Sequence, residues 1–169
     1  MNAPFGWASV RSFYGWEDRF LMDLAGWEAR MVVVPAPPGC SFFYDADADT
    51  IRDPGESSRG IRVHPKIAGE LAACLLEIHD AGLWRFVEPI AGGYAFRAQR
   101  GGARLSMHAL GGAADFDVAR NPFRVDPERT ALGTEPGLGV VAIFERRGWE
   151  WGGRYDRPDA MHFGFAGGY

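Results

Sequence analysis

The stretch with the most distinctive chemistry, residues 106–117, reads SMHALGGAADFD. Within it, His108 and Asp115 stand seven residues apart, with Gly111 and Gly112 between them. Two glycines permit a sharp reversal of the chain, so both side chains can point at one spot. Neutral imidazole and carboxylate both suit zinc. Two ligands from one hairpin do not make a site, so a third must come from elsewhere.

The chain holds four histidines, and they differ in how well they suit that role. His79 falls on a predicted helix, one residue past its apolar stripe, which is typical of a boundary histidine. His64 precedes the same helix and could cap or order it. His162 follows Asp159 by three residues, which places a carboxylate beside a metal ligand without making it one. A lone histidine among glycines and aromatic residues is usually a core residue, but this conjunction favours His162.

The clearest helix is predicted to begin at Pro65 and to stop near Gly82. Proline suits the first helical position, because the N–H that it lacks would have no partner there. Glycine is a common residue just past a helix C-terminus. Between these ends, apolar residues recur at helical spacing, namely Ile67, Leu71, Leu75 and Ile78.

The other predicted elements are short. They are a strand at 94–98, a loop at 99–104, a helical turn from Asp126-Pro127, a helix at 139–147 ended by Gly148, and short strands with tight loops from Trp149 onward. Residues 1–60 are harder to interpret: residues 13–27 are partly helical in period, residues 31–34 predict a strand, and residues 45–60 predict an exposed loop. The apolar face predicted for 13–27 consists of Trp16, Phe20, Leu24 and Trp27. Strands and helices do not alternate in the βαβ manner, so a small α+β domain is predicted.

Size and composition limit the class of protein. A chain of 169 residues predicts a single domain, 1–169, large enough to bury a core. An apolar share of 47% and a charged share of 24% argue against disorder. The net charge of −4, with no basic tract, argues against nucleic acid as a partner. No stretch approaches the roughly 20 apolar residues of a membrane span, and the first residues do not resemble a secretory signal. We therefore expect a protein that is cytoplasmic as synthesised.

The chain has two cysteines, Cys40 and Cys74. They are too few for a disulfide scaffold, and they lack the C-x-x-C spacing of a zinc knuckle. They could pair or stay reduced, and two buried thiols are the simpler interpretation.

Two motifs carry a resemblance to a known family. Residues 106–115 match the pattern Ser-x-His-x-x-Gly-x-Ala-x-Asp, filled by Ser106, His108, Gly111, Ala113 and Asp115. This pattern resembles that of the M15-type zinc peptidases, which include D-Ala-D-Ala carboxypeptidases, L-alanoyl-D-glutamate endopeptidases and phage endolysins. Residues 148–153 (GWEWGG) resemble the family's Trp-x-Trp-Gly-Gly stretch, and residues 159–163 (DAMHF) resemble its Asp/Glu-x-x-His close. Upstream, Gly92-Gly93-Tyr94 and Arg97 are similar to its first strand, so the likeness covers about residues 62–165.

The resemblance implies a Hedgehog/DD-peptidase-like α+β fold, with a central antiparallel sheet that is flanked by helices and carries the ligands. It implies that His108, Asp115 and His162 bind Zn²⁺ and leave a fourth position for water. Asp159 would be the general base that accepts a proton from that water. An aspartate at this position resembles the phage-type endopeptidases more than the vancomycin-resistance dipeptidases.

The resemblance also indicates substrate-binding residues. Arg97 is expected to bind a substrate carboxylate or carbonyl, for which a guanidinium fork is well suited. Arg100 and Arg104 are near enough in sequence to compete for this role, although each is ordinarily a solvated loop charge. Ser106 could donate a hydrogen bond to substrate or order the turn. Asp117 is expected to support a ligand histidine or the nearby backbone. Trp149 and Trp151 are expected to lie in the core or the cleft wall, and Glu150, which alternates with them, is expected to face solvent.

The predicted activity is hydrolysis of peptidoglycan stem peptides. The enzyme could be an endopeptidase at an L-Ala–D-Glu bond or a carboxypeptidase that removes a terminal D-Ala. The absence of a recognisable signal favours a phage lysin released through a holin-type pore. The alternative is a non-catalytic, zinc-containing module that binds the cell wall or is structural. Asp159 argues against it, because a protein without catalysis has no need of that carboxylate. The sequence indicates no oligomeric state.

Overall fold

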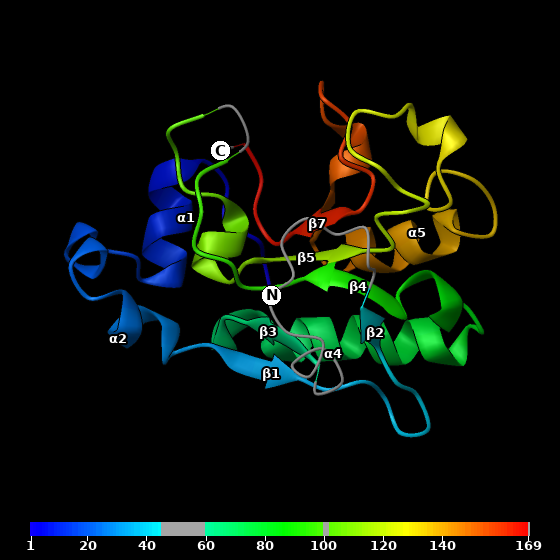
Figure 1. Ribbon diagram of the computed structural model, residues 1–169, viewed down its shortest axis with the longest axis horizontal. Coiled ribbons are helices and arrows are strands. Elements are labelled where there is room, and N and C mark those ends of the chain that lie inside the picture. The colour runs from blue at the N-terminus through cyan, green and yellow to red at the C-terminus, as the bar shows by residue number, and fades with distance from the viewer. Residues whose placement is uncertain (45–59, 100–101, 169) are drawn as a thin grey trace.

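In the computed structural model, five strands form one sheet in the order β2-β4-β5-β7-β6, with helices around it (Figure 1). The structure describes residues 1–44, 60–99 and 102–168. The strands are β1 (Val32–Val34), β2 (Phe43–Tyr44), β3 (Ile61–Val63), β4 (Pro89–Gly92), β5 (Ala113–Phe116), β6 (Glu150–Trp151) and β7 (His162–Gly164). The helices are α1 (Trp7–Tyr14), α2 (Leu24–Glu28), α4 (Pro65–Asp80) and α5 (Leu138–Arg146), with 3₁₀ turns η1 (Asp18–Leu21), η2 (Trp84–Phe86), η3 (Met107–Leu110), η4 (Pro127–Arg129) and η5 (Gly152–Arg154). This mixture confirms the predicted α+β class.

The centre of the sheet is antiparallel, as predicted. Strands β4, β5, β7 and β6 pair antiparallel, whereas β2 adds a parallel edge beside β4. Strands β1 and β3 form a separate antiparallel pair. In the central register, Asp115 lies opposite His162. Residues directly opposite each other project from the same face of a sheet, so these two side chains share one face.

The helix predicted from Pro65 is α4, and its residue pattern explains its ends. His64 is its N-cap, and the ring nitrogen Nδ1 accepts a hydrogen bond from the Lys66 N–H at 3.2 Å. Gly82 has a φ of 71° just past the helix, which confirms the predicted stop. The four residues of the predicted apolar stripe are completely buried. The helix packs against α5 and β1, so it closes one side of the core.

An aromatic cluster joins α5 to the sheet. Phe144 of α5 stacks on Phe163 of β7 with ring centroids 4.2 Å apart, and Phe116 of β5 lies within 6.0 Å of both rings. All three side chains are fully buried. Phe116 directly follows Asp115 and Phe163 directly follows His162, so the aromatic side chains project from the opposite face. Packing on one face therefore fixes the backbone that presents the two polar side chains on the other.

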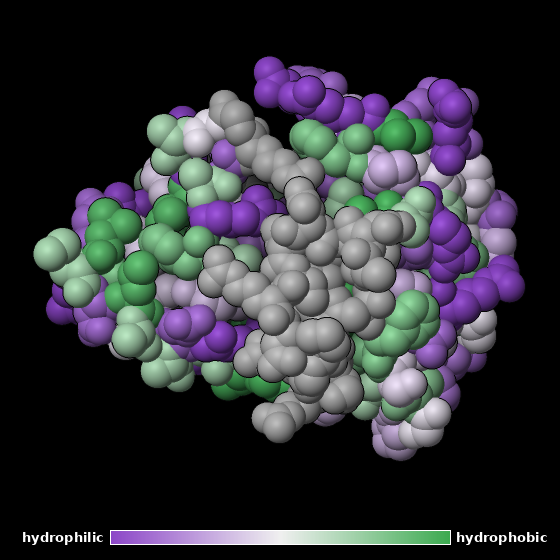
Figure 2. All heavy atoms as spheres, in the orientation of Figure 1, coloured by the Kyte–Doolittle hydropathy of each residue, from purple (hydrophilic) through white to green (hydrophobic). Residues whose placement is uncertain are grey.

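The helical period at residues 13–27 was only partly right. The segment is not one helix, because Gly15 ends α1 in the left-handed conformation with a φ of 69° and Asp23 caps α2 by accepting from the Gly26 N–H. Trp16, Phe20 and Trp27 are buried as predicted, but Leu24 is 37% exposed. Figure 2 shows apolar side chains gathered at the end of the molecule that contains η1 and α2, to which Leu21 and Met22 also contribute.

The strand predicted at residues 94–98 was wrong. Strand β4 ends at Gly92, and the following segment donates its backbone bonds to two different neighbours. The Tyr94 N–H donates to the Arg62 carbonyl at 2.6 Å, and the Ala95 N–H donates to the His108 carbonyl at 3.2 Å. Only an isolated bridge between Ala98 and Leu105 follows. The alternating segment therefore lies between β3 and η3 and hydrogen-bonds to both of them, instead of pairing along its length with one strand.

Residues before 60 pack directly on the remainder of the chain. The Trp27 indole N–H donates to the Ala109 carbonyl at 2.9 Å, and the Tyr14 hydroxyl donates to the Phe165 carbonyl at 2.9 Å. The exposed loop predicted at 45–60 lies outside the described residues except for Gly60. Across the described ranges, no helix combines the length and the apolar character needed to cross a membrane.

The two cysteines are unpaired thiols. Cys74 is buried in α4, and burial raises the pKa of its thiol to about 12. Cys40 is half-buried. The two thiols do not pair with each other in this fold, and only one of them is fully buried as expected.

Candidate metal centre and cleft

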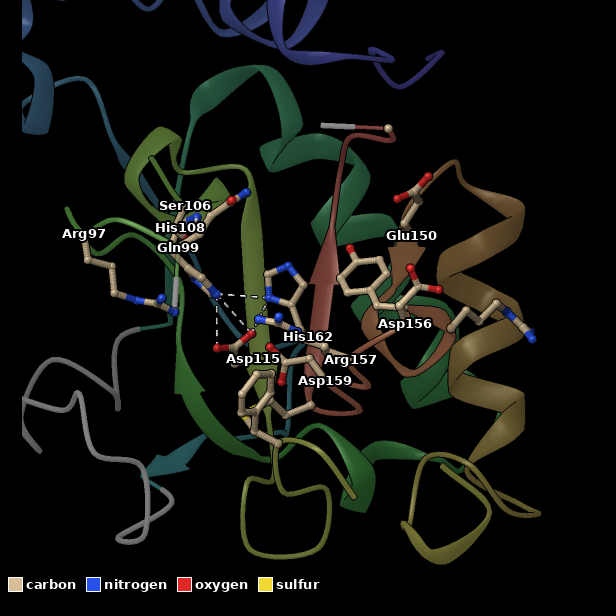
Figure 3. A pocket seen from close by; sticks show the side chains of 15 residues that line it. Arg97, Gln99, Ser106, His108, Asp115, Glu150, Asp156, Arg157, Asp159 and His162 are labelled. Carbon is tan, nitrogen blue, oxygen red and sulfur yellow. Dashed lines mark hydrogen bonds and ion pairs between the residues drawn. The ribbon is translucent and has the colours of Figure 1, made fainter. Parts of the chain in front are cut away.

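Three side chains from three elements converge at the open face of the sheet. They are His108 from η3, Asp115 from β5 and His162 from β7 (Figure 3). His108 Nε2 lies 3.1 Å from Asp115 Oδ1 and 3.1 Å from His162 Nδ1. His162 Nδ1 lies 2.8 Å from Asp115 Oδ1. The structure thus brings together the three residues that the sequence predicted as ligands.

Glycines make the hairpin between His108 and Asp115 possible. Ser106 begins η3 by accepting a hydrogen bond from the His108 N–H at 3.3 Å. Gly111 ends it with a φ of 68°, and a Cβ there would lie 2.5 Å from Met31 Sδ. No other residue fits this conformation and this space without strain. The chain therefore reverses within a few residues, and β5 returns Asp115 beside His108.

The orientation of the His108 ring is fixed from behind. Its Nδ1 lies 2.6 Å from the Gly93 carbonyl, which can only accept, so Nδ1 carries the proton. In the neutral ring, Nε2 then presents a lone pair toward Asp115 and His162. A histidine that binds a metal commonly donates its other N–H to a carbonyl in this way. The family pattern assigns Gly93 only to its first strand, and no local motif predicts that its carbonyl contacts the histidine.

The donor set fits a zinc ion. Two imidazole nitrogens and a carboxylate oxygen lie 2.8 to 3.1 Å apart and face a common space. Tetrahedral ligands about 2.1 Å from zinc are roughly 3.4 Å apart, close to the separations seen. Without a metal these atoms share protons in hydrogen bonds, and a dication that displaces those protons would bind the same lone pairs. The residues present therefore suit a metal with one coordination position left open.

The charges at this place perturb one another strongly. Burial alone would raise the pKa of Asp115, but the charge and hydrogen bonds of His108 and His162 hold it well below its ordinary value. Burial alone would lower the pKa of His162, but the hydrogen bond and charge of Asp115, together with the charge of Asp159, raise it. The two histidines thus favour the ionised form of Asp115, which is the form in which a carboxylate binds a metal.

The triad forms part of the wall of an open cleft of about 630 Å³. This volume is within the range typical of small-ligand sites. The other lining residues are Arg97, Gln99, Ser106, Phe123, Glu150, Arg154, Tyr155, Asp156, Arg157, Asp159, Met161 and Gly168. The cleft thus has arginines and carboxylates on its walls and the three converging side chains between them (Figure 3).

Asp159 projects into the cleft close to the triad. Its N–H donates to the Gly152 carbonyl at 2.8 Å, and its own carbonyl accepts from the His162 N–H at 3.0 Å. This tight turn places the carboxylate beside the space that Asp115 and His162 face (Figure 3). Its charge is felt by His162. The three-residue spacing thus keeps Asp159 next to the triad but outside the ligand set. A general base that acts on a metal-bound water has to lie in such a position.

Among the three candidate arginines, only Arg97 is found in the cleft. It lines the wall, and its charge opposes protonation of His162. Arg104 is exposed and does not line the cleft, whereas Arg100 lies outside the described residues. Ser106 caps η3 and also lines the cleft, so both roles considered for it are compatible with its position.

Two neighbouring acidic residues differ in how they meet the predictions: Asp117 supports the nearby backbone, one of the two roles expected for it, whereas Glu150 lies in a place that was not expected. Asp117 is buried and pairs with Arg120, and its backbone carbonyl accepts from the Asn121 side chain at 2.9 Å. It supports the loop after β5 rather than a ligand histidine. Glu150 is half-buried and lines the cleft instead of facing bulk solvent. Glu150 alternates with the buried Trp149 and Trp151, which predicts that its side chain points away from the core. That pattern does not predict which part of the protein lies on the other side.

The two remaining histidines lie away from the cleft, as predicted. His64 caps α4, and its ring packs edge-on against Tyr14 with centroids 5.3 Å apart. Burial, with the charges of Lys66 and Arg30, lowers the pKa of His64 to about 4. His79 is exposed and pairs with the neighbouring Asp80 at 3.1 Å. Neither residue reaches the triad.

Comparison with known proteins gives one match. A peptidase M15 family model, described as D-alanyl-D-alanine carboxypeptidase, matches residues 100–165. The search of curated proteins and the search of solved structures gave no match. The matched segment contains His108, Asp115, Asp159 and His162, whereas Arg97 lies just before it. The resemblance of this chain to the M15-type peptidases, predicted from its two motifs, is thereby confirmed.

Proposed function

We propose that this protein is a zinc metallopeptidase that hydrolyses peptide bonds of bacterial peptidoglycan stem peptides. The observation that carries the proposal is the convergence of His108, Asp115 and His162 at 2.8 to 3.1 Å in a cleft that also contains Asp159. The family model that matches residues 100–165 supports a peptidase of this class. The proposal treats residues 1–169 as one catalytic domain with its peptidase core at 62–165, against which Tyr14 and Trp27 of the N-terminal segment pack.

His108, Asp115 and His162 would hold the zinc ion. When bound, zinc polarises a carbonyl and lowers the pKa of a bound water toward 7. The Gly93 carbonyl keeps the proton of His108 on Nδ1, so Nε2 stays available as a ligand. Asp115 supplies the negative charge that partly balances a dication in this buried place. The protein thus contributes a converged ligand set, whose atoms need to separate by only about 0.3 to 0.6 Å to reach tetrahedral spacing.

Asp159 is the proposed general base. It would accept a proton from the attacking water and deliver it to the leaving amine. Its backbone is held between Gly152 and His162 by two hydrogen bonds of 2.8 and 3.0 Å, so its carboxylate moves little relative to the ligands. Arg97, on the cleft wall, is proposed to bind a substrate carboxylate or carbonyl. Ser106 is proposed to assist it with a hydroxyl hydrogen bond.

The test combines metal content with activity on purified peptidoglycan. We expect one zinc per chain and release of muropeptides by the wild type. Asp159→Asn should retain the zinc and lose at least a hundredfold in rate, since general base catalysis contributes about 10²–10⁴. Asp156→Asn, which removes an exposed carboxylate from the same cleft, controls for the change in charge. Mass spectra of the released ends would identify the bond, and with it an endopeptidase or a carboxypeptidase.

The same experiment separates the alternative function. A protein that binds zinc but releases nothing from several wall chemotypes would be a non-catalytic wall-binding or structural module. A protein that takes up no metal would overturn the proposal altogether. Activity that survives intact in Asp159→Asn would leave a peptidase but remove Asp159 as its base.

A further inference from the structure

Glu150 has a position in the cleft that the proposed chemistry leaves unused. Strand β6 places it opposite Gly164 of β7, while its neighbour Trp151 lies opposite Phe163 in the core. Side chains alternate along each strand, so Glu150 projects from the same face as His162 and Asp115. It therefore belongs to the reactive face of the sheet, on the strand beyond β7 (Figure 3).

The space between Glu150 and the triad is bounded by Gly164 and by the Tyr155 side chain, whose hydroxyl oxygen would lie 3.8 Å from a Cβ at Gly164. His162 and Glu150 are diagonal neighbours across β7 and β6, a relation that places such residues about 7–8 Å apart. Gly164, between them, has no side chain, and a Cβ there would lie 3.3 Å from His162 Nε2. Gly167 lies against Glu150 itself, since a Cβ there would lie only 2.3 Å from Glu150 Oε1. The carboxylate thus lies against glycine backbone and is not covered from the cleft.

The carboxylate of Glu150 lacks a cationic partner within the described part of the chain. No ion pair or hydrogen bond engages it there, although arginines line the same cleft. Arg154 is held by Glu145 through two bonds of 2.6 and 3.0 Å. Partial burial raises the pKa of Glu150 above its ordinary value, as expected for a carboxyl that gains nothing from a neighbour. A half-buried acid without a partner gains free energy when a cation arrives.

We propose that Glu150 is a specificity residue that binds a primary ammonium group of the substrate within about two residues of the scissile bond. This inference rests on the proposed peptidase function. Two residues of an extended peptide span about 6.6 Å, which matches the diagonal distance from His162 to Glu150. Arg97 is positioned to bind an anionic group and Glu150 a cationic one. The cleft therefore selects a dipolar peptide, with its ammonium toward β6.

The ammonium could be the free amino terminus of a stem peptide or the side-chain amine of its diamino acid. Four synthetic peptides distinguish these sources: L-Ala-D-Glu-L-Lys-D-Ala-D-Ala with both amines free, with either one acetylated, and with both acetylated. A hydrogen bond to a charged group contributes about 1.5–3 kcal/mol. Acetylation of the amine that binds should therefore lower kcat/KM about tenfold or more in the wild type, mainly through KM. Acetylation of the other amine should change it little.

Glu150→Gln keeps the shape of the side chain and removes its charge. We expect it to cut all four peptides at similar rates, with the zinc content and thermal unfolding of the wild type. Glu150→Asp should restore part of the discrimination. Binding of the same peptides to zinc-loaded Asp159→Asn, measured by calorimetry, should show the same preference without turnover. Wild-type protein that treats the four peptides alike, or Glu150→Gln that still discriminates, would overturn this inference and leave the peptidase intact. Wild-type protein that cuts none of them would instead overturn the proposed function.

Discussion

Substitution of Gly152 by alanine tests whether the placement of Asp159 controls the reaction. A Cβ at Gly152 would lie 2.4 Å from the Asp159 carbonyl oxygen, 3.1 Å from Asp159 Cβ and 3.1 Å from His162 Cβ. Ordinary van der Waals contact begins near 3.4 Å. The backbone at Asp159 must therefore withdraw by about 1 Å, whereas His162 needs to move only a few tenths of an ångström. The change thus displaces the proposed base more than the ligand.

The expected loss follows from that displacement. A misplacement of about 1 Å in a catalytic group can cost about a hundredfold in rate. We expect Gly152→Ala to lower kcat/KM on a stem peptide by about this factor, while the protein retains one zinc per chain. Overpacking of this kind also costs about 1–3 kcal/mol of folding free energy, which thermal or urea unfolding would detect. Assays below the unfolding transition separate the two effects.

Gly69 provides the matched control. It lies in α4, where a Cβ would meet nothing within 4 Å, so Gly69→Ala should keep full activity and gain about 0.5–1 kcal/mol of stability. The reasoning is refuted if folded, zinc-loaded Gly152→Ala has activity within about threefold of the wild type. Loss of zinc together with activity would show that the ligand His162, and not Asp159, had moved.

Three further predictions concern the ligand set and the packing that supports it. Asp115→Asn should weaken zinc binding about a hundredfold or more in a chelator competition, because it removes the only charged ligand, whereas Asp156→Asn should leave the affinity unchanged. Trp27→Phe should cost about 1–3 kcal/mol in urea unfolding, because it leaves the Ala109 carbonyl, beside His108, without its 2.9 Å donor; a loss below about 0.3 kcal/mol would contradict this. The pKa of His64 is lowered to about 4, so the unfolded chain binds more protons between about pH 4 and 6.5, and stability should fall as pH drops through that window by about 1–2 kcal/mol after solvent screening. His64→Asn retains a capping group and should lose that part of the pH dependence. The urea midpoint should therefore differ less between pH 7 and pH 4.5 in this variant than in the wild type. An equal difference in the two proteins would contradict the role given to His64.

Local sequence determined much of this protein. The extent of α4 followed from Pro65, Gly82 and the apolar stripe between them, because a helix of this length is defined by its own caps and period. The Ser106–Asp115 motif likewise encodes its own hairpin, since Gly111 reverses the chain wherever the segment lies. The spacing of Asp159 and His162 fixed their relation in one tight turn. These features depend on contacts within a few residues.

Other features depended on partners distant in sequence. Residues 94–98 alternate like a strand, but β3 and η3 divide their hydrogen bonds, and no local pattern could show this. The place of Glu150 in the cleft was missed for the same reason. Glu150 alternates with the aromatic residues Trp149 and Trp151, but only the pairing of β6 with β7 turns it into the cleft. The motifs thus encode which side chains carry the chemistry, whereas the order of strands in the sheet decides which of them face one another, because that order is set by long-range packing.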